Sequence, residues 1–483
     1  MRSFLNLLLK NISSYQIITK NAFWLGSSKI IGGILRALLV IFSARILGPE
    51  HYGNFSLAIN FVLIFSFLPE FGLTSILTRE LSKEKEEKRY DIFNCIFSIS
   101  LILSFLSYIL IFLVGYFTIK NPVAFKLLPI LGLMMIFDVL REMIYSIYRA
   151  QLKGELQGIL HFFTNLLLFI LGFSLLKIFK SEFYLAIGYT IAIFLGFILS
   201  MLFAFDFIKK LKLIFNWILY KNYFNSSWPI ALGNTLYLLL LYTDSVILSW
   251  YHPTSLVGIY NSAVKINEFL ILLPTGIALS ILPLLSKNLS EKEILKDQIN
   301  FSIYLNYLIT LPVISGIFIL SDKIVNFVFG GEYIFAHIAL KILIPSFLAS
   351  SFFMIYSQLL IALDKRKELL LYEFISFLIN LVFNLIFIPK YGIIAASFNT
   401  TLSNYIALFF AHFYIKKYVD VNIFNNIKNP LIASLVMSVL VTFIKSLFLP
   451  LIVLFGFILY ILTLFLLKDE LTLKILKIIF RKY

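Results

Sequence analysis

The most informative part of the sequence is residues 53–83, which read GNFSLAINFVLIFSFLPEFGLTSILTRELSK. No residue from 53 to 69 is charged, so the run is apolar over most of the roughly 20 residues that a bilayer-spanning helix needs. The whole chain of 483 residues is 60% apolar and 14% charged, whereas soluble domains carry about 45–50% apolar and about 25% charged residues. This composition excludes a soluble enzyme and a disordered chain, and a single cysteine excludes a disulfide-rich domain.

Similar apolar runs, bounded by charged residues, Pro, Gly or Asn, follow along the chain. The bilayer offers the backbone no hydrogen-bond partner, and the alternating pattern of a barrel is absent, so each run predicts a helix. The expected ranges are 22–44, 54–78, 91–118, 127–148, 158–176, 183–205, 224–249, 258–285, 299–320, 342–363, 369–388, 391–413, 430–444 and 450–467. The predicted fold class is an all-α polytopic membrane protein with about 14 transmembrane helices.

The positive charges predict how these helices are oriented. Of the 41 Lys and Arg residues, 28 lie in one alternating set of loops, nine in the other and four inside spans. Cytoplasmic loops are enriched in Lys and Arg, so this split predicts a protein of the cytoplasmic membrane with both termini in the cytoplasm. The same spread argues against a nucleic-acid partner, since no loop has the charge density that a phosphate backbone requires. We expect no cleaved signal at the N-terminus, and an amphipathic helix over residues 4–18.

A second stretch of the chain repeats the first. Residues 258–287 read GIYNSAVKINEFLILLPTGIALSILPLLSK, at an offset of about 205 residues. The matching positions are Gly53 and Gly258, Ala58 and Ala263, and Pro69 and Pro274. A weaker match relates the turn and span after Arg149 to those after Ala362. The pattern favours duplication over chance similarity between two helices rich in Leu and Ile.

The duplication predicts the domain organisation. Residues 1–215 are expected to form a six-helix lobe, residues 216–415 a second six-helix lobe, and residues 416–483 two additional transmembrane helices and a cytoplasmic tail. Six is even, so both lobes begin on the same side and are related by an axis along the membrane normal, as in alternating-access transporters. Pro69 and Pro274 are expected to be hinges, with static kinks as the alternative, because Pro removes a helix hydrogen bond.

One motif resembles a known family. Residues 44–55, ARILGPEHYGNF, followed by Glu70-Phe71-Gly72-Leu73 and Arg79-Glu80, resemble the first two helices of the polysaccharide-biosynthesis (Wzx-type) flippases. These belong to the multidrug/oligosaccharidyl-lipid/polysaccharide exporter superfamily. Residues 329–336, FGGEYIFA, look like that family's turn before its tenth helix.

The resemblance implies a flippase and not an enzyme. Its substrate would be an isoprenoid-diphosphate-linked oligosaccharide, carried across the cytoplasmic membrane for the biosynthesis of O-antigen, capsule or exopolysaccharide. Its partners would be the lipid bilayer, this substrate, and polysaccharide polymerase and glycosyltransferase machinery. Transport would proceed by alternating access through a central cationic cavity.

Basic residues inside the spans are the candidate diphosphate ligands, because an ionisable group there is costly and functional by default. The side chains expected to line the cavity and bind diphosphate and sugar are Lys29, Arg36, Lys265 and Arg141. Lys29 and Arg36 are seven residues apart and share a helix face. Gly32 and Gly33, between them, are expected to let a bulky headgroup approach the backbone.

Acidic residues in or near the spans are expected to balance these cations or to carry a coupling H⁺ or Na⁺. They are Glu268, Asp244, Glu70 and Asp138. No cofactor and no metal is expected. Several alternatives stay open: Lys29 could snorkel to the interface, Lys265 with Glu268 and Asp138 with Arg141 could simply pair as i,i+3 neighbours, and Asp244 could be solvated near the outer end of its span.

Two other functions compete with the flippase. A drug or cation exporter of the same superfamily would favour an acidic cavity, whereas the in-span cations favour an anionic substrate. A polytopic lipid-linked glycan polymerase would need a sizeable outer-face loop, and the longest expected one covers only residues 321–341. No phosphate-binding loop, H-E-x-x-H helix or G-x-S-x-G elbow occurs in the sequence.

Overall fold

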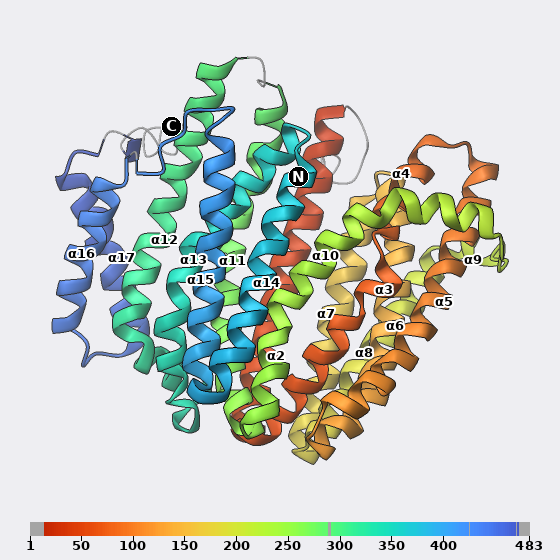
Figure 1. Cartoon of the computed structure of the whole chain (residues 1–483), viewed down its shortest axis with the longest axis horizontal. Helices are drawn as coiled ribbons and strands as arrows, with labels where there is room; N and C mark the ends of the chain where they lie inside the picture. The colour runs from red at the N-terminus through yellow and green to blue at the C-terminus, as the bar shows by residue number, and fades with distance from the viewer. Residues whose placement is uncertain (1–13, 288–290, 425, 470, 473–483) are drawn as a thin grey trace, which may run out of the picture. The chain divides into compact units, whose positions relative to one another are not determined.

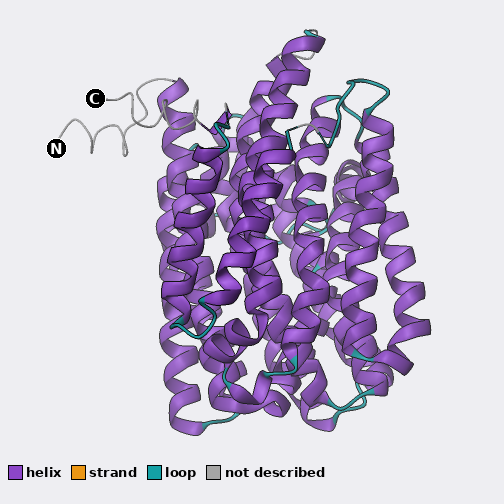
Figure 2. Ribbon diagram, turned by 90° about the vertical axis from the view of Figure 1, so that its left-hand side faces the viewer, coloured by secondary structure: helices purple, strands orange, loops and turns teal. Residues whose placement is uncertain are grey.

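The computed structural model describes residues 14–287, 291–424, 426–469 and 471–472. Within these ranges the chain forms helices joined by short loops and contains no strand (Figure 2). The predicted all-α class is therefore confirmed. Most of the amphipathic helix expected over residues 4–18 falls outside the described residues.

The chain divides into two compactly packed units, Met1–Asn261 and Ser262–Tyr483. The helices that belong wholly to unit 1 are α2 (Ser14–Phe65), α3 (Phe67–Glu70), α4 (Leu73–Lys83), α5 (Glu86–Thr118), α6 (Pro122–Ala150), α7 (Gly154–Phe179), α8 (Glu182–Phe203), α9 (Phe205–Lys209) and α10 (Trp217–Tyr251) (Figure 1). In unit 1, α2 packs against α7, α6 and α10, and α8 packs against α6 and α7.

Helix α11 (Thr254–Lys287) begins in unit 1 and continues into unit 2. Unit 2 further contains α12 (Lys292–Phe329), the 3₁₀ helix η1 (Gly331–Tyr333), α13 (Ala336–Ala362), α14 (Arg366–Tyr391), α15 (Ile393–Ile415), α16 (Lys428–Phe443) and α17 (Leu449–Leu466). In unit 2, α13 packs against α12 and α15, and α12 packs against α16 and α17. This boundary follows packing, whereas the boundary expected at 215–216 follows the sequence repeat, so the division into lobes stays a prediction.

Each of the fourteen expected span ranges is largely helical, and the range 54–78 is divided among α2, α3 and α4. Among the described residues, twelve helical stretches are long and apolar enough to cross a membrane, so the chain is a multi-span membrane protein. The first stretch, Phe23–Lys83, contains two of the expected ranges. Within it, α2 consists of two helical segments that meet at a kink at Gly48 (φ 72°, ψ 173°). Only glycine adopts that backbone conformation readily, and Pro49 suits the first turn of the helix that follows. Lys428–Phe443 is shorter, with 16 residues, and the number of crossings stays a prediction.

The two copies of the repeat meet inside unit 1, through their first glycines. A Cβ atom on Gly53 would overlap the carbonyl oxygen of Thr254, and one on Gly258 would overlap the carbonyl oxygen of Pro49. Small residues of this kind let membrane helices approach closely. The glycines recognised as equivalent in sequence therefore form the contact between α2 and the start of α11.

The turns at the ends of α6 and α13 also match. Lys153 N–H donates to Tyr148 O at 2.9 Å, and Lys365 N–H donates to Leu360 O at 2.7 Å. The residue before each lysine has a positive φ, 56° at Leu152 and 57° at Asp364. The matching hydrogen bonds pair Tyr148 with Leu360 and Lys153 with Lys365, so the two copies of the repeat are offset by 212 residues in this region. It supports the duplication inferred from sequence.

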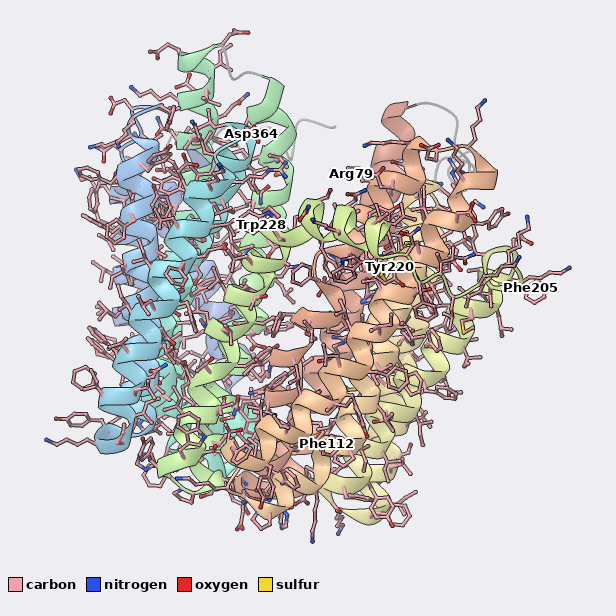
Figure 3. The ribbon with its side chains drawn as sticks, turned by 45° about the vertical axis from the view of Figure 1, so that its right-hand side comes forward. Arg79, Phe112, Phe205, Tyr220, Trp228 and Asp364 are labelled. Carbon is pink, nitrogen blue, oxygen red and sulfur yellow. The ribbon has the colours of Figure 1, made fainter. Side chains whose placement is uncertain are left out.

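The two prolines of the repeat lie in different backbone contexts. Pro69 lies in α3, and the residues after α3, Phe71 and Gly72, both have positive φ values, 31° and 68°. A Cβ on Gly72 would lie 2.9 Å from the carbonyl oxygen of Ser227, one residue before the labelled Trp228, where α10 bends (Figure 3). Helix α11 instead continues without a break through Pro274. The helix is therefore interrupted near Pro69 only, and a hinge motion at either proline stays a prediction.

Candidate functional site

Lys29 and Arg36 lie on one exposed strip of α2. Both side chains are exposed, and they are separated by about two helical turns. Gly32 and Leu39, on the neighbouring face, are buried and pack against α7. The exposed apolar residues Ile30, Ile31, Ile34 and Leu38 lie about 100–200° around the helix from Lys29, at about 100° per residue. The cations are thus separated from the face best suited to lipid.

Arg36 is oriented by a polar residue of α7. Its Nε donates to Oδ1 of Asn165 at 2.6 Å, and Asn165 Nδ2 donates in turn to the carbonyl oxygen of His161 at 2.7 Å. A Cβ on Gly32 would lie 2.8 Å from Asn165 Nδ2. Gly32 therefore brings the two helices together, which corrects the expectation that it admits a headgroup to the backbone. Sequence reasoning missed Asn165, although an asparagine in an apolar span is itself a signal.

Arg141 is enclosed within unit 1. Its side chain is 2% exposed, and Nη2 pairs with Asp138 Oδ1 at 2.6 Å and with Glu142 Oε1 at 3.7 Å. Its guanidinium also lies over the Tyr145 ring, 5.3 Å from the centroid. The i,i+3 pairing considered as an alternative is present, and burial keeps Arg141 from direct contact with a large substrate in this arrangement.

Arg149, at the end of α6, joins the same region. Its Nη2 donates to Ser146 Oγ at 2.8 Å, its Nη1 pairs with Glu142 Oε2 at 3.4 Å, and its Nε donates to Thr78 Oγ1 at 3.3 Å. Glu70 interacts electrostatically with Glu142 and Arg149. We call this set the charged cluster of unit 1: Glu70, Asp138, Arg141, Glu142 and Arg149.

His161 links Arg36 to the charged cluster. It interacts electrostatically with Arg36, Arg141 and Asp138. Four of the sequence-predicted residues, Arg36, Glu70, Asp138 and Arg141, are therefore brought into one region of unit 1, while Lys29 lies further along α2. No set of three or more His, Cys, Asp or Glu side chains in the described ranges is grouped so as to hold a metal ion.

Asp244 lies in a separate polar group of unit 1. It is 1% exposed, so the alternative that it is solvated is wrong. Tyr260 donates a hydrogen bond to Asp244 Oδ2 at 2.7 Å. Beside it, Asn60 Nδ2 donates to Asn261 Oδ1 at 2.9 Å and to Ser245 Oγ at 3.2 Å. These polar partners come from α2, α10 and α11, which sequence spacing could not bring together.

In unit 2, Lys265 and Glu268 form a local pair. Lys265 Nζ lies 2.7 Å from Glu268 Oε2, with side chains 27% and 30% exposed. The i,i+3 pairing considered as an alternative is therefore present, and both groups keep partial access to their surroundings. The convergence of Lys265 and Arg36 on one cavity stays a prediction.

Comparisons with known proteins identify the relatives of this chain. The profile of the family described as "Polysaccharide biosynthesis protein" matches residues 18–289, and that of the MatE family matches residues 229–386. The "Probable low-salt glycan biosynthesis flippase Agl15" of Haloferax volcanii is 28% identical over 202 residues, which cover 41% of this chain and only 42% of that protein. The "Putative O-antigen transporter" of Shigella flexneri is 25% identical over 410 residues, 80% of this chain and 94% of that protein.

A solved structure shares the fold. "Lipid II flippase MurJ, inward closed conformation" matches with a TM-score of 0.78 over 93% of this chain and 99% of that chain, at 19% identity. This match shows that the polytopic helical fold is shared, and the two relatives named above are a flippase and a transporter, not enzymes. The family profile covers more than half of the sequence, and the chain belongs to the polysaccharide biosynthesis protein family. The resemblance seen at residues 44–55 and the expected superfamily are thereby confirmed.

Proposed function

We propose that this protein is a flippase that moves isoprenoid-diphosphate-linked oligosaccharides across the cytoplasmic membrane for polysaccharide biosynthesis. The observation that carries the proposal is Arg36, an exposed and oriented cation inside the first apolar span. Relatives named as a glycan biosynthesis flippase and an O-antigen transporter support the substrate class. Alternating access and a cytoplasmic position of both termini belong to the proposal.

Arg36 is suited to a diphosphate by its geometry. Its Nε is used by Asn165, while its terminal nitrogens have no hydrogen-bond partner among the described residues. Two parallel N–H groups of a guanidinium match two phosphate oxygens, and such charge-assisted bonds replace part of the hydration that the diphosphate loses. Lys29 lies about 10 Å along the helix and would hold the diphosphate at a different depth.

The remaining predicted residues take different roles in this mechanism. Lys265 would contribute a second cation to the cavity, with Glu268 balancing its charge. The buried Arg141 and its partly exposed partner Asp138 would set the electrostatic field around His161 and Arg36. Glu70 and Asp244 would carry the coupling H⁺ or Na⁺, because both are carboxylic acids within or beside apolar spans. Pro69 and Pro274 would be the hinges.

Transport by the reconstituted protein tests the proposal. Full-length protein in liposomes is offered a fluorescent isoprenoid-diphosphate sugar or a cationic dye. We expect transport of the sugar lipid, its loss in Arg36→Ala, and partial retention in Arg36→Lys, because a point charge replaces a bidentate one. Ile34→Ala, on the exposed apolar face of the same helix, is the matched control and should transport normally.

The MatE match to residues 229–386 supports one alternative, a drug or cation exporter. Dye transport that persists in Arg36→Ala, with no movement of the sugar lipid, would establish that alternative and refute the flippase. A polymerase would instead lengthen the glycan in the same liposomes. Export in cells with and without neighbouring polymerase and glycosyltransferase genes tests the proposed partners.

A further inference from the structure

A pocket of about 480 Å³ lies in unit 1, where the ends of α5, α6, α7 and α8 meet α9. Its polar and aromatic lining includes Arg89, Tyr90, Gln151, Lys153, Asp206 and Phe207. The flippase mechanism uses none of these residues. We propose that this pocket binds the headgroup of an anionic phospholipid from the surrounding bilayer.

The pocket offers two cations to a phosphate. The Nε of Arg89 donates to the carbonyl oxygen of Glu84 at 2.8 Å, which holds the guanidinium at the start of α5. The side chain of Lys153 is exposed at the start of α7 and makes no ion pair or hydrogen bond with any described residue. Basic pockets between membrane helices are suited to lipid phosphates. One acid, Asp206, can accept a hydrogen bond from a headgroup hydroxyl.

The far wall of the pocket is rigidly built. The Tyr90 ring packs against Phe207 with centroids 4.8 Å apart, and Lys210 Nζ lies 3.9 Å from the Tyr90 centroid. The segment after α9 is fixed to α5, since Asn94 Nδ2 donates to Lys210 O at 3.0 Å and Ile214 N–H donates to Ser98 Oγ at 3.0 Å. The binding surface therefore exists before the ligand arrives, which lowers the entropic cost of binding.

Apolar side chains around the pocket favour a lipid over a free anion. Leu202, Phe203 and Phe205 are each more than half exposed, and the labelled Phe205 lies at the edge of the unit (Figure 3). Leu152 is half-exposed and adopts φ 56°, a conformation that a leucine occupies at a cost. These side chains can contact acyl chains while the phosphate lies between Arg89 and Lys153.

Ligand titration of the full-length protein in detergent tests this site. The probes are phosphatidylglycerol, phosphatidylcholine and inorganic phosphate, followed by native mass spectrometry and thermal unfolding. We expect phosphatidylglycerol to bind most tightly and to raise the unfolding temperature. Lys153→Gln should weaken its binding about fivefold and Arg89→Gln/Lys153→Gln about 25-fold, as each Lys or Arg near the membrane surface adds about a factor of five.

A matched control removes the same charge outside the pocket. Lys83→Gln/Lys88→Gln changes two exposed lysines that do not line it and should bind phosphatidylglycerol like the wild type. Phe203→Ser/Phe205→Ser should weaken phosphatidylglycerol binding without changing any charge. Lys153→Gln, at an exposed position, serves if the double variant fails to fold.

Three outcomes would overturn the proposal. They are equal affinity for phosphatidylcholine, unchanged phosphatidylglycerol binding in Lys153→Gln, and competition by inorganic phosphate with no effect of Phe203→Ser/Phe205→Ser. The last result would assign the pocket to a free anion. The transport assay of Arg36→Ala does not depend on any of these results.

Discussion

The interiors of the two units are polar in different ways. Of the charged side chains that the described part of the chain buries, unit 1 holds Lys20, Arg141, Glu182 and Asp244, and unit 2 holds Asp469. The transmembrane interior of unit 2 instead uses amides and hydroxyls: Asn384 Nδ2 donates to Asn380 Oδ1 at 2.8 Å, and Asn399 Nδ2 donates to Asn384 Oδ1 at 2.9 Å. Neutral amides and hydroxyls satisfy one another's hydrogen bonds without adding a net charge. A buried charge instead loses its hydration, which costs free energy, and it creates an electrostatic field around it. Two units that are both built from packed helices therefore do not need the same electrostatics.

The alignment of the α6–α7 and α13–α14 turns locates this divergence. At an offset of 212, Asp138 corresponds to Ser350 and Arg141 to Phe353. Unit 1 therefore carries an ion pair where the second copy carries a hydroxyl and an aromatic ring. The helix can fold with either, so the charges are not needed for packing as such. This favours a role for them in the proposed transport of an anion.

The largest effect on stability should come from breaking the ion pair on its exposed side. Asp138→Asn leaves the guanidinium of Arg141 buried, with the Tyr145 ring and the more distant carboxylate of Glu142 at 3.7 Å, so we expect a loss near the lower end of the roughly 3–5 kcal/mol typical of such changes. Arg141→Met should cost less, because Asp138 is 37% exposed and reaches water. Unfolding in a detergent titration measures both, with Ser350→Ala as the unit 2 control. Equal losses of unfolding free energy in Asp138→Asn and Arg141→Met would mean that water reaches both members of the ion pair.

The next largest effect should arise where the two copies agree. Gly53→Ala and Gly258→Ala each place a methyl group onto a backbone oxygen, which moves only if a whole helix shifts. We expect each to lose about 2–3 kcal/mol of unfolding free energy. Gly26→Ala and Gly276→Ala are matched controls on the same helices, with no atom within 4 Å of the added Cβ, and should be neutral or slightly stabilising. A tolerated Gly53→Ala would show that α2 and α11 do not pack this closely.

A smaller effect should follow from opening the amide chain of unit 2. Asn384→Leu removes the hydrogen bonds to Asn380 and Asn399, all three being fully buried, so we expect a loss of about 2 kcal/mol. Because no charge changes, sugar-lipid transport per folded molecule should stay within about twofold of the wild type. If a well-folded Asn384→Leu protein does not transport, the amide chain of unit 2 is needed for transport as well as for stability, and the contrast between the units is wrong.

Sequence alone predicted the helices well, because apolar run length is a direct consequence of the bilayer's thickness. It also matched Gly53 with Gly258, and the structure shows that both glycines are packed tightly against backbone. It placed the Asp138–Arg141 and Lys265–Glu268 pairs correctly among its alternatives, because i,i+3 neighbours meet on any helix.

What sequence could not supply was contact between distant segments. Asn165 is 129 residues from Arg36, and only the packing of α7 on α2 brings the two together. The sequence around Arg149 suggests an ordinary loop cation, because it does not show which distant side chains Arg149 contacts. Asp244 looked solvated for the same reason, although Tyr260 covers it.

The smallest effect concerns the two turns that match in hydrogen bonding but differ in residue. Leu152 and Asp364 have nearly the same positive φ, which Asp and Asn tolerate and leucine does not. We expect Leu152→Asn to gain about 1 kcal/mol of unfolding free energy in detergent, and Asp364→Leu to lose a similar amount. The proposed lipid pocket gives Leu152 a role that offsets this cost, since its side chain would contact the lipid. Leu152→Asn should therefore bind phosphatidylglycerol more weakly, although it is more stable to unfolding in detergent without lipid. If both its stability and its affinity for phosphatidylglycerol increase, Leu152 does not contact lipid.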